Sequence, residues 1–205
     1  MPLAVHEDFP QSESIRQAIR SAWIALWLSP ALGFILVHSA CAPDPAADIF
    51  SAIQLGDVKA VERFVSRSSD LDSLSGAGVT PLHQAISVGS AEIVALLLDK
   101  GASIETKDIS DLTPLAHAAA ENKPEIVRVL VEHGAELDHA DTRGRLPLHW
   151  AVRQNAAEAA RELILAGANI NARDGYGDTP LRIAKASRHA SLYEYLQSQG
   201  AREAP

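Results

Sequence analysis

Cysteine is almost absent from this chain of 205 residues, in which Cys41 is the single example. One cysteine permits no disulfide within the chain, so the fold must be held together by packing alone. An excess of basic residues is also lacking, because 18 Lys and Arg stand against 26 Asp and Glu. The net charge of −8 argues against nucleic acid or an anionic membrane surface as the main partner.

Catalytic and ligand-binding motifs are scarce as well. Gly175-Tyr176-Gly177 begins like a dinucleotide fingerprint, but no third glycine follows in the required place. The eight histidines do not form a metal-ligand motif, since His83 and His149 recur at one register of a repeat. No nucleophile elbow or other positioned nucleophile is visible. The sequence therefore predicts a protein that is not an enzyme, holds no metal or other cofactor and takes no small-molecule substrate.

What the chain does contain is one short motif in four copies. Its first copy is Thr80-Pro81-Leu82-His83-Gln84-Ala85, and its prolines stand at residues 81, 114, 147 and 180, which are 33 residues apart. A Gly-Ala pair begins at residues 101, 134, 167 and 200, and an aspartate stands at 108, 141 and 174, with the same period. A fixed period of this size predicts one supersecondary unit stacked on itself.

Each repeat predicts two helices followed by a turn. Proline suits the first position of a helix, where its missing N–H has no intrahelical partner, and the threonine before it can cap that helix. A second amphipathic stretch follows, for example Glu125-Ile126-Val127-Arg128-Val129-Leu130-Val131. The periodic glycine is expected to end this helix in a left-handed conformation. Leu146 replaces the capping threonine in the fourth unit, which predicts a local loss of about 1 kcal/mol.

The motif, the Gly-Ala pair and the period together resemble the ankyrin-repeat family. The resemblance implies an all-α ankyrin-repeat solenoid of about five helix-turn-helix units with projecting β-turns. Residues 47–205 are expected to form this domain, with capping units at about 47–78 and 179–205. In the family, the motif histidine usually forms a hydrogen bond with the backbone of the adjoining turn. A protein partner meets the projecting turns and the exposed side of the inner helices.

This resemblance assigns candidate partner-binding residues by register. Trp150 occupies a position on the exposed side of the inner helix that Gln84, His117 and Ile183 fill in other units, so the fold does not demand an indole there. Tryptophan and arginine are enriched at interface hot spots, and arginines that face solvent together suit an acidic partner. The alternative is that Trp150 packs against its own neighbours and the arginines are a solvated face. The predicted partner-binding residues are Trp150, Arg143, Arg145, Arg153, Gln154, Tyr176, Glu121 and His117.

The segment before the repeats has a different character. Residues 22–37 form an uncharged, largely apolar stretch of 16 residues, preceded by two arginines and followed by small residues, which is typical of a secretory signal. Ser39-Ala40-Cys41 resembles the bacterial lipobox, in which the cysteine is lipidated and the leader removed, although His38 stands where leucine is usual. Cleavage after Ala42 for soluble export and an uncleaved N-terminal anchor are the alternatives.

These features together predict a lipoprotein exported to the bacterial envelope. Residues 1–41 are then the signal peptide or anchor, and residues 42–46 are a short linker. The protein would face the periplasm, anchored in the membrane through lipid on Cys41, or else be soluble in the periplasm or held by its N-terminal segment. Its expected role is to bind a protein partner without catalysis. The alternative role is that of a dedicated inhibitor, such as an immunity protein, or a helper of an envelope enzyme.

Overall fold

The computed structural model describes residues 48–67 and 70–203. Every regular element within these ranges is an α-helix, and none of these helices is long and apolar enough to cross a membrane. The helices are α3 (Ile49–Gln54), α4 (Val58–Val65), α5 (Pro81–Val88), α6 (Ala91–Asp99), α7 (Pro114–Ala120), α8 (Pro124–Glu132), α9 (Pro147–Arg153), α10 (Ala157–Leu165), α11 (Pro180–Ala186) and α12 (Ala190–Ser198). Cys41, the apolar segment 22–37 and the linker 42–46 lie outside the described residues.

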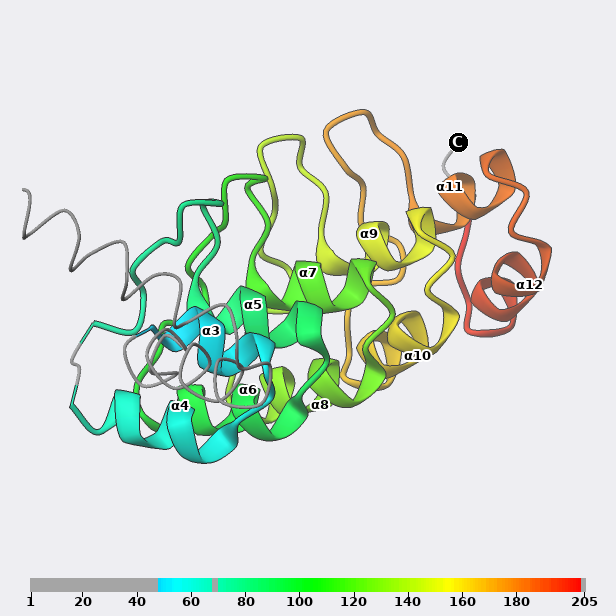
Figure 1. Ribbon diagram of the computed structural model, residues 1–205. Coiled ribbons are helices and arrows are strands. Elements are labelled where there is room, and N and C mark those ends of the chain that lie inside the picture. Colours follow the sequence, from blue (N-terminus) through cyan, green and yellow to red (C-terminus); the bar gives the residue numbers. More distant parts are fainter. Residues whose placement is uncertain (1–47, 68–69, 204–205) are drawn as a thin grey trace, which may run out of the picture. The chain divides into compact units, whose positions relative to one another are not determined.

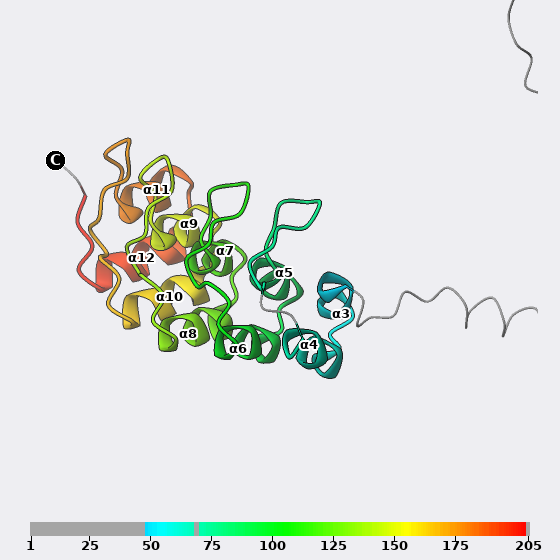
Figure 2. The ribbon, with the colours of Figure 1, turned by 90° about the vertical axis from the view of Figure 1, so that its left-hand side faces the viewer.

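The helices of residues 48–203 form five pairs that stack side by side (Figures 1 and 2). The inner layer holds the first helix of each pair, and the outer layer holds the second (Figure 2). Between units, the most extensive helix contacts all join neighbours in the stack, such as α5 with α7 and α7 with α9. The expected all-α solenoid of about five helix-turn-helix units is therefore confirmed.

The prolines of the motif begin the inner helices as predicted. α5, α7, α9 and α11 each start at a proline, and the Oγ1 atoms of Thr80, Thr113 and Thr179 each accept a backbone N–H at 3.3 Å. Leu146 caps α9 with no side-chain hydrogen bond; instead its own N–H donates to His149 Nδ1 at 3.2 Å. The fourth unit therefore lacks the hydroxyl that satisfies the first turn of the inner helix in the second, third and fifth units.

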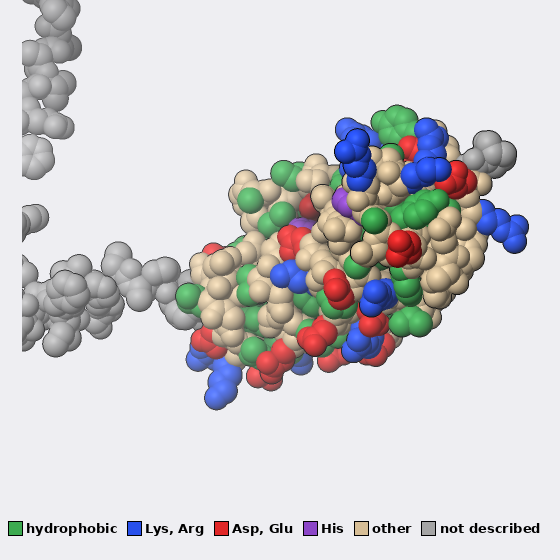
Figure 3. Space-filling model, turned by 90° about the vertical axis from the view of Figure 1, so that its right-hand side faces the viewer, with side chains coloured by type: hydrophobic (Ala, Val, Ile, Leu, Met, Phe, Trp, Pro, Cys, Tyr) green, Lys and Arg blue, Asp and Glu red, His purple; other side chains and the backbone are tan. Residues whose placement is uncertain are grey.

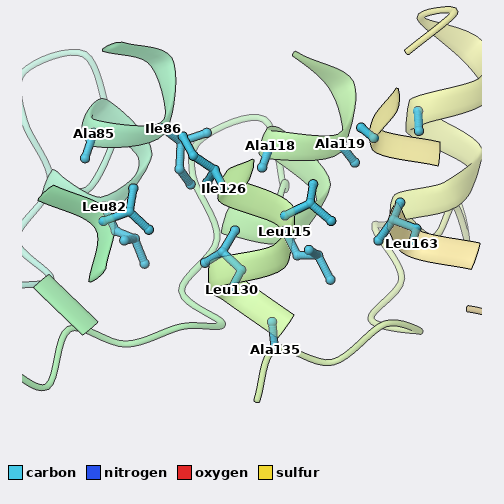
Figure 4. Close-up of a cluster of buried hydrophobic side chains, with 14 of the residues drawn as sticks. Leu82, Ala85, Ile86, Leu115, Ala118, Ala119, Ile126, Leu130, Ala135 and Leu163 are labelled. Carbon is cyan, nitrogen blue, oxygen red and sulfur yellow. The ribbon is translucent and has the colours of Figure 1, made fainter. Parts of the chain in front are cut away.

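The core runs the length of the stack between the two layers. The motif leucines and alanines of the inner helices are buried along it, namely Leu82, Leu115, Leu148, Leu181, Ala85, Ala118, Ala151 and Ala184. Figure 4 shows side chains of the inner helices, such as Leu115, beside Ile126 and Leu130 of the outer helix α8. Alanine lets neighbouring helices approach closely, while each leucine fills the space between the layers. No unit can bury its own apolar face alone, so the stability of each unit depends on its neighbours.

Glycine ends the outer helices α6, α8, α10 and α12 in the left-handed conformation that the register predicts. The φ angle is +89° at Gly134 and +99° at Gly167. The N–H groups of Gly134 and Ala135 donate to the carbonyls of Val131 and Leu130 at 2.9 and 3.0 Å, which satisfies the end of α8. A Cβ added at Gly134 or Gly167 would meet nothing within 4 Å. The requirement for glycine at these two positions is therefore conformational and not steric.

We expect Gly134→Val to lower the free energy of unfolding by more than about 1 kcal/mol, because a β-branched side chain tolerates positive φ poorly. Gly134→Ala is the matched control, and its smaller loss reports the cost of the backbone conformation by itself. Urea unfolding of both variants and of the wild type measures the difference. A valine variant within a few tenths of a kcal/mol of wild type would contradict the left-handed assignment.

Candidate partner-binding surface

Projecting turns lie side by side along one edge of the stack (Figure 1). They span residues 75–79, 108–112, 141–145 and 174–178, and in each the first N–H donates to the last carbonyl at 2.9–3.0 Å. The predicted projecting turns are therefore present, each closed by its own backbone hydrogen bond. This edge and the neighbouring inner helices hold the residues that the sequence assigns to partner binding.

The periodic aspartate holds each turn from inside. Oδ1 of Asp108 accepts the N–H groups of Ser110 and Leu112 at 2.8 and 3.0 Å. Asp141 and Asp174 do the same in the next two turns, at 2.8–2.9 Å. The sequence shows the periodic aspartate but not what it does. Only the structure shows that its carboxylate folds back and accepts the backbone N–H groups two and four residues ahead. One oxygen of each carboxylate is left for other contacts.

Neighbouring turns are joined to each other at their tips. The N–H of Gly175 donates to the carbonyl of Arg143 at 2.8 Å, and the N–H of Ile109 donates to that of Gly78 at 3.1 Å. A Cβ added at Gly144 would lie only 2.6 Å from the backbone nitrogen of Gly175, so these two turns need glycine to come this close. The N–H of Thr142 donates to Asp111 Oδ2 and joins the two middle turns. The turns therefore form a connected ridge instead of independent loops.

Trp150 lies at the base of this ridge, in a cluster with Asp141 and Arg145. Its indole Nε1 donates to Asp141 Oδ2 at 3.2 Å, and the Arg145 guanidinium carbon lies 3.9 Å from the centre of the indole ring. Arg145 Nη2 lies 2.8 Å from the same carboxylate, and the Arg145 and Asp141 side chains are 11% and 4% exposed. Trp150 thus has partners within its own unit, and the charge of Arg145 is balanced by Asp141.

The electrostatics of this cluster favour the charged pair. Burial raises the pKa of the Asp141 carboxyl, but hydrogen bonds from the backbone and guanidinium of Arg145 and from the backbone of Arg143 outweigh it. The pKa of Asp141 is therefore held below its usual value, and the carboxylate stays ionised. Among the predicted arginines, Arg145 consequently offers little free positive charge to a partner.

The other predicted residues fall into three places. Arg143 and Tyr176 are exposed in adjoining turns, and Arg153 and Gln154 are exposed at the far end of α9. Glu121 and His117 bond each other, with Oε1 3.0 Å from Nε2, at the inner helix of the third unit. Ile183 is buried in the core, which corrects its assignment to the exposed side of the inner helix. An apolar side chain at that register gains from burial against its neighbours.

The motif histidines link the second and fourth units to the turn of the next unit, as the family resemblance implies. His83 Nε2 lies 3.0 Å from the carbonyl of Leu112, and His149 Nε2 lies 3.2 Å from the carbonyls of Ala172 and Asp178. A carbonyl can only accept, so Nε2 carries the proton in both rings. Burial lowers the pKa of both histidines, and they remain neutral at neutral pH.

The fourth and fifth units carry the most exposed aromatic and basic side chains of the ridge. Seen from the end of the stack that bears α12, Lys and Arg side chains gather at the upper edge beside hydrophobic side chains (Figure 3). Tyr176 is 70% exposed, and Arg143 and Arg173 are exposed near it. We call Arg143, Arg173 and Tyr176 the tip patch.

Two family models match the chain. One, for ankyrin repeats in three copies, matches residues 49–141, and the other, for ankyrin repeats in many copies, matches residues 130–184. The chain is an ankyrin-repeat protein. No curated protein matches it. Ankyrin-repeat proteins are typically non-catalytic modules, and the repeats of this one point to binding of a protein partner.

We expect Trp150→Ala to lower the free energy of unfolding of this ankyrin-repeat protein by about 2 kcal/mol. The substitution removes both the contact with Arg145 and the hydrogen bond to Asp141. Trp150→Phe keeps an aromatic ring under Arg145 and is expected to cost about 1 kcal/mol, the value of the hydrogen bond. Denaturant unfolding of both variants measures this, and an unchanged Trp150→Ala variant would mean that the indole is free for a partner.

Proposed function

We propose that this ankyrin-repeat protein binds a partner with an acidic surface through the tip patch. The exposure of Tyr176 carries the proposal, because a large aromatic side chain that is 70% exposed at a turn tip leaves most of its surface free for a partner. Tyrosine and arginine are among the residues that most often dominate the energy of an interface. Arg143 and Tyr176 offer both types on adjoining turns.

The charge of the tip patch supports an acidic partner. Within the described residues, Arg143 and Arg173 form no ion pair, whereas Arg145 is paired with Asp141 and Arg182 with Asp178. The chain as a whole carries a net charge of −8, so the tip patch is a local positive surface on an acidic protein. Complementary charge of this kind accelerates association and fixes orientation, and salt weakens its effect.

The backbone under the tip patch is already ordered. Asp141 and Asp174 hold the two turns from inside, and the hydrogen bond from Gly175 to Arg143 joins them. A surface that needs little ordering loses less conformational entropy when it binds. The tip patch therefore presents its side chains on a scaffold that suits recognition.

We expect Tyr176→Ala to weaken binding of the partner by at least about 2 kcal/mol, or roughly 30-fold, with Arg143→Ala adding a salt-dependent loss. The partner is first identified by cross-linking to the wild type, and its affinity is then measured for the wild type, for Tyr176→Ala and for the control variant Leu165→Ala. Leu165 suits the control because it is 77% exposed, on the outer helix α10. Equal binding by wild type and by a Tyr176→Ala, Arg143→Ala double variant would exclude the tip patch.

We further propose that the protein acts in the bacterial envelope, tethered by lipid on Cys41. The motif Ser39-Ala40-Cys41 after an apolar stretch supports this proposal. The diacylglycerol that a lipobox cysteine carries has two acyl chains, which suffice for stable anchoring because each buried methylene adds about 0.8 kcal/mol. Tethering would keep the repeats close to the membrane and limit the partner to proteins of the envelope.

Cys41→Ser is expected to release the protein from the membrane fraction or to block its processing. Cell fractionation and the mass of the mature N-terminus measure the two effects. Because Cys41 lies outside the described repeats, we expect Cys41→Ser to bind the partner in vitro as the wild type does. Unchanged processing with membrane retention would contradict lipidation and favour an uncleaved anchor, whereas processing after Ala42 would favour soluble export.

A further inference from the structure

Two histidines and an aspartate meet between the second and third units, away from the tip patch. His83 comes from α5, Asp108 from the turn before α7, and His117 from α7 itself. Each offers one ligand atom, and these atoms all lie within 4.8 Å of one another. The Asp108 side chain is 5% exposed and that of His117 is 15% exposed, while His83 is fully buried. Stacking alone brings the three together.

The two ring nitrogens of His117 face different carboxylates, Nε2 that of Glu121 and Nδ1 that of Asp108. Nε2 lies 3.0 Å from Glu121 Oε1, so the proton of the neutral ring sits on Nε2. Nδ1 then carries a lone pair, is buried and has no hydrogen-bond partner among the described residues. It lies 3.9 Å from Asp108 Oδ2. Two buried acceptors that face each other need a donor or a cation between them, and a bound metal ion would satisfy both.

We propose that His83, Asp108 and His117 bind a divalent transition-metal ion of the zinc class. Two imidazoles and one carboxylate are the donor set that such ions prefer, and two ligands of one tetrahedral zinc ion lie roughly 3–4 Å apart. The 3.9 Å between His117 Nδ1 and Asp108 Oδ2 falls in this range. Water would take the fourth position, because three protein ligands leave one side open.

The surroundings supply the outer contacts that a metal site needs. Glu121 accepts from His117 Nε2, and a carboxylate in that position orients a histidine ligand and increases its basicity. Thr80 Oγ1 lies 2.8 Å from His83 Nδ1 and can accept a hydrogen bond from it when the proton of the ring is on Nδ1. In that tautomer His83 frees the Nε2 lone pair for the ion and gives up its hydrogen bond to Leu112.

The other units show why the site occurs at this interface. The next interface has Ala116, Asp141 and Trp150 in the three registers, and there the free oxygen of Asp141 is bonded by Trp150 and Arg145. The following one has His149, Asp174 and Ile183, so the second imidazole is missing. Only the combination of His83 with His117 creates the donor set within residues 48–67 and 70–203.

Calorimetric titration of the full chain with Zn²⁺, after removal of metal with a chelator, tests the site. We expect one tight site, and His117→Gln should weaken it at least tenfold. Gln84 occupies this register in the second unit, so the fold accepts glutamine there. Asp108→Asn is a second variant: its amide oxygen can still accept the N–H groups of Ser110 and Leu112, while the charge at the metal is lost.

His139→Gln is the matched control, because His139 Nδ1 also lies near carboxylates, 3.3 Å from Glu105 and 3.6 Å from Glu136. It is expected to bind Zn²⁺ as wild type does and to show the same rise in melting temperature with Zn²⁺. The same loss in His139→Gln as in His117→Gln would show diffuse surface binding and overturn the proposal. Binding only at millimolar Zn²⁺ would overturn it too.

The tests of the metal site and of the tip patch have independent outcomes. Zn²⁺ binding by the isolated chain requires no partner, and the tip patch is built from residues of the fourth and fifth units. Loss of Zn²⁺ binding with retained partner binding would remove this inference and leave the proposed function standing. A bound ion would fasten α5 to the turn and inner helix of the next unit, and would thereby stiffen the stack at that interface.

Discussion

The apolar contact between successive helix pairs is the interaction on which the rest of this protein depends. Each pair buries its leucines and alanines against the next pair, and no unit encloses a core of its own. Without a disulfide, the free energy of this burial has to offset the loss of chain entropy. The same stacking sets the spacing of the turns and brings side chains of adjoining units into contact.

Polar contacts then refine what stacking has placed. His83 and His149 reach across the interface to the backbone of the next turn, and Asp108, Asp141 and Asp174 hold the turns themselves. The third unit has Ala116 in place of the motif histidine, so no histidine of that unit bonds the backbone of the turn 141–145. At that turn the contact of Trp150 and Arg145 with Asp141 ties the ridge to α9 instead. Different side chains thus hold the turns to the inner helices in different units.

The two proposed sites use different parts of this scaffold. The tip patch lies where backbone is held by its own hydrogen bonds and the side chains are free for a partner. The cluster of His83, Asp108 and His117 lies where side chains of two units converge out of solvent. His117 and Tyr176 stand at registers that other residues fill in other units, because the periodic proline, leucine and glycine specify the fold. A binding surface and an ion site can therefore coexist on one short stack.

The sequence by itself determined the architecture, because its rules are local. Proline begins a helix, glycine ends one at positive φ, and a period of 33 residues repeats both, so the helix pairs, their number and their turns could be predicted. The leader and Cys41 remain a prediction from the sequence. Only the tertiary structure decided the surroundings of Trp150, the burial of Ile183 and the meeting of His83 with His117. The meeting of His83 with His117 joins residues about one repeat apart and follows from how closely the helix pairs pack. The contacts of Trp150 depend on how the turn 141–145 folds back onto α9.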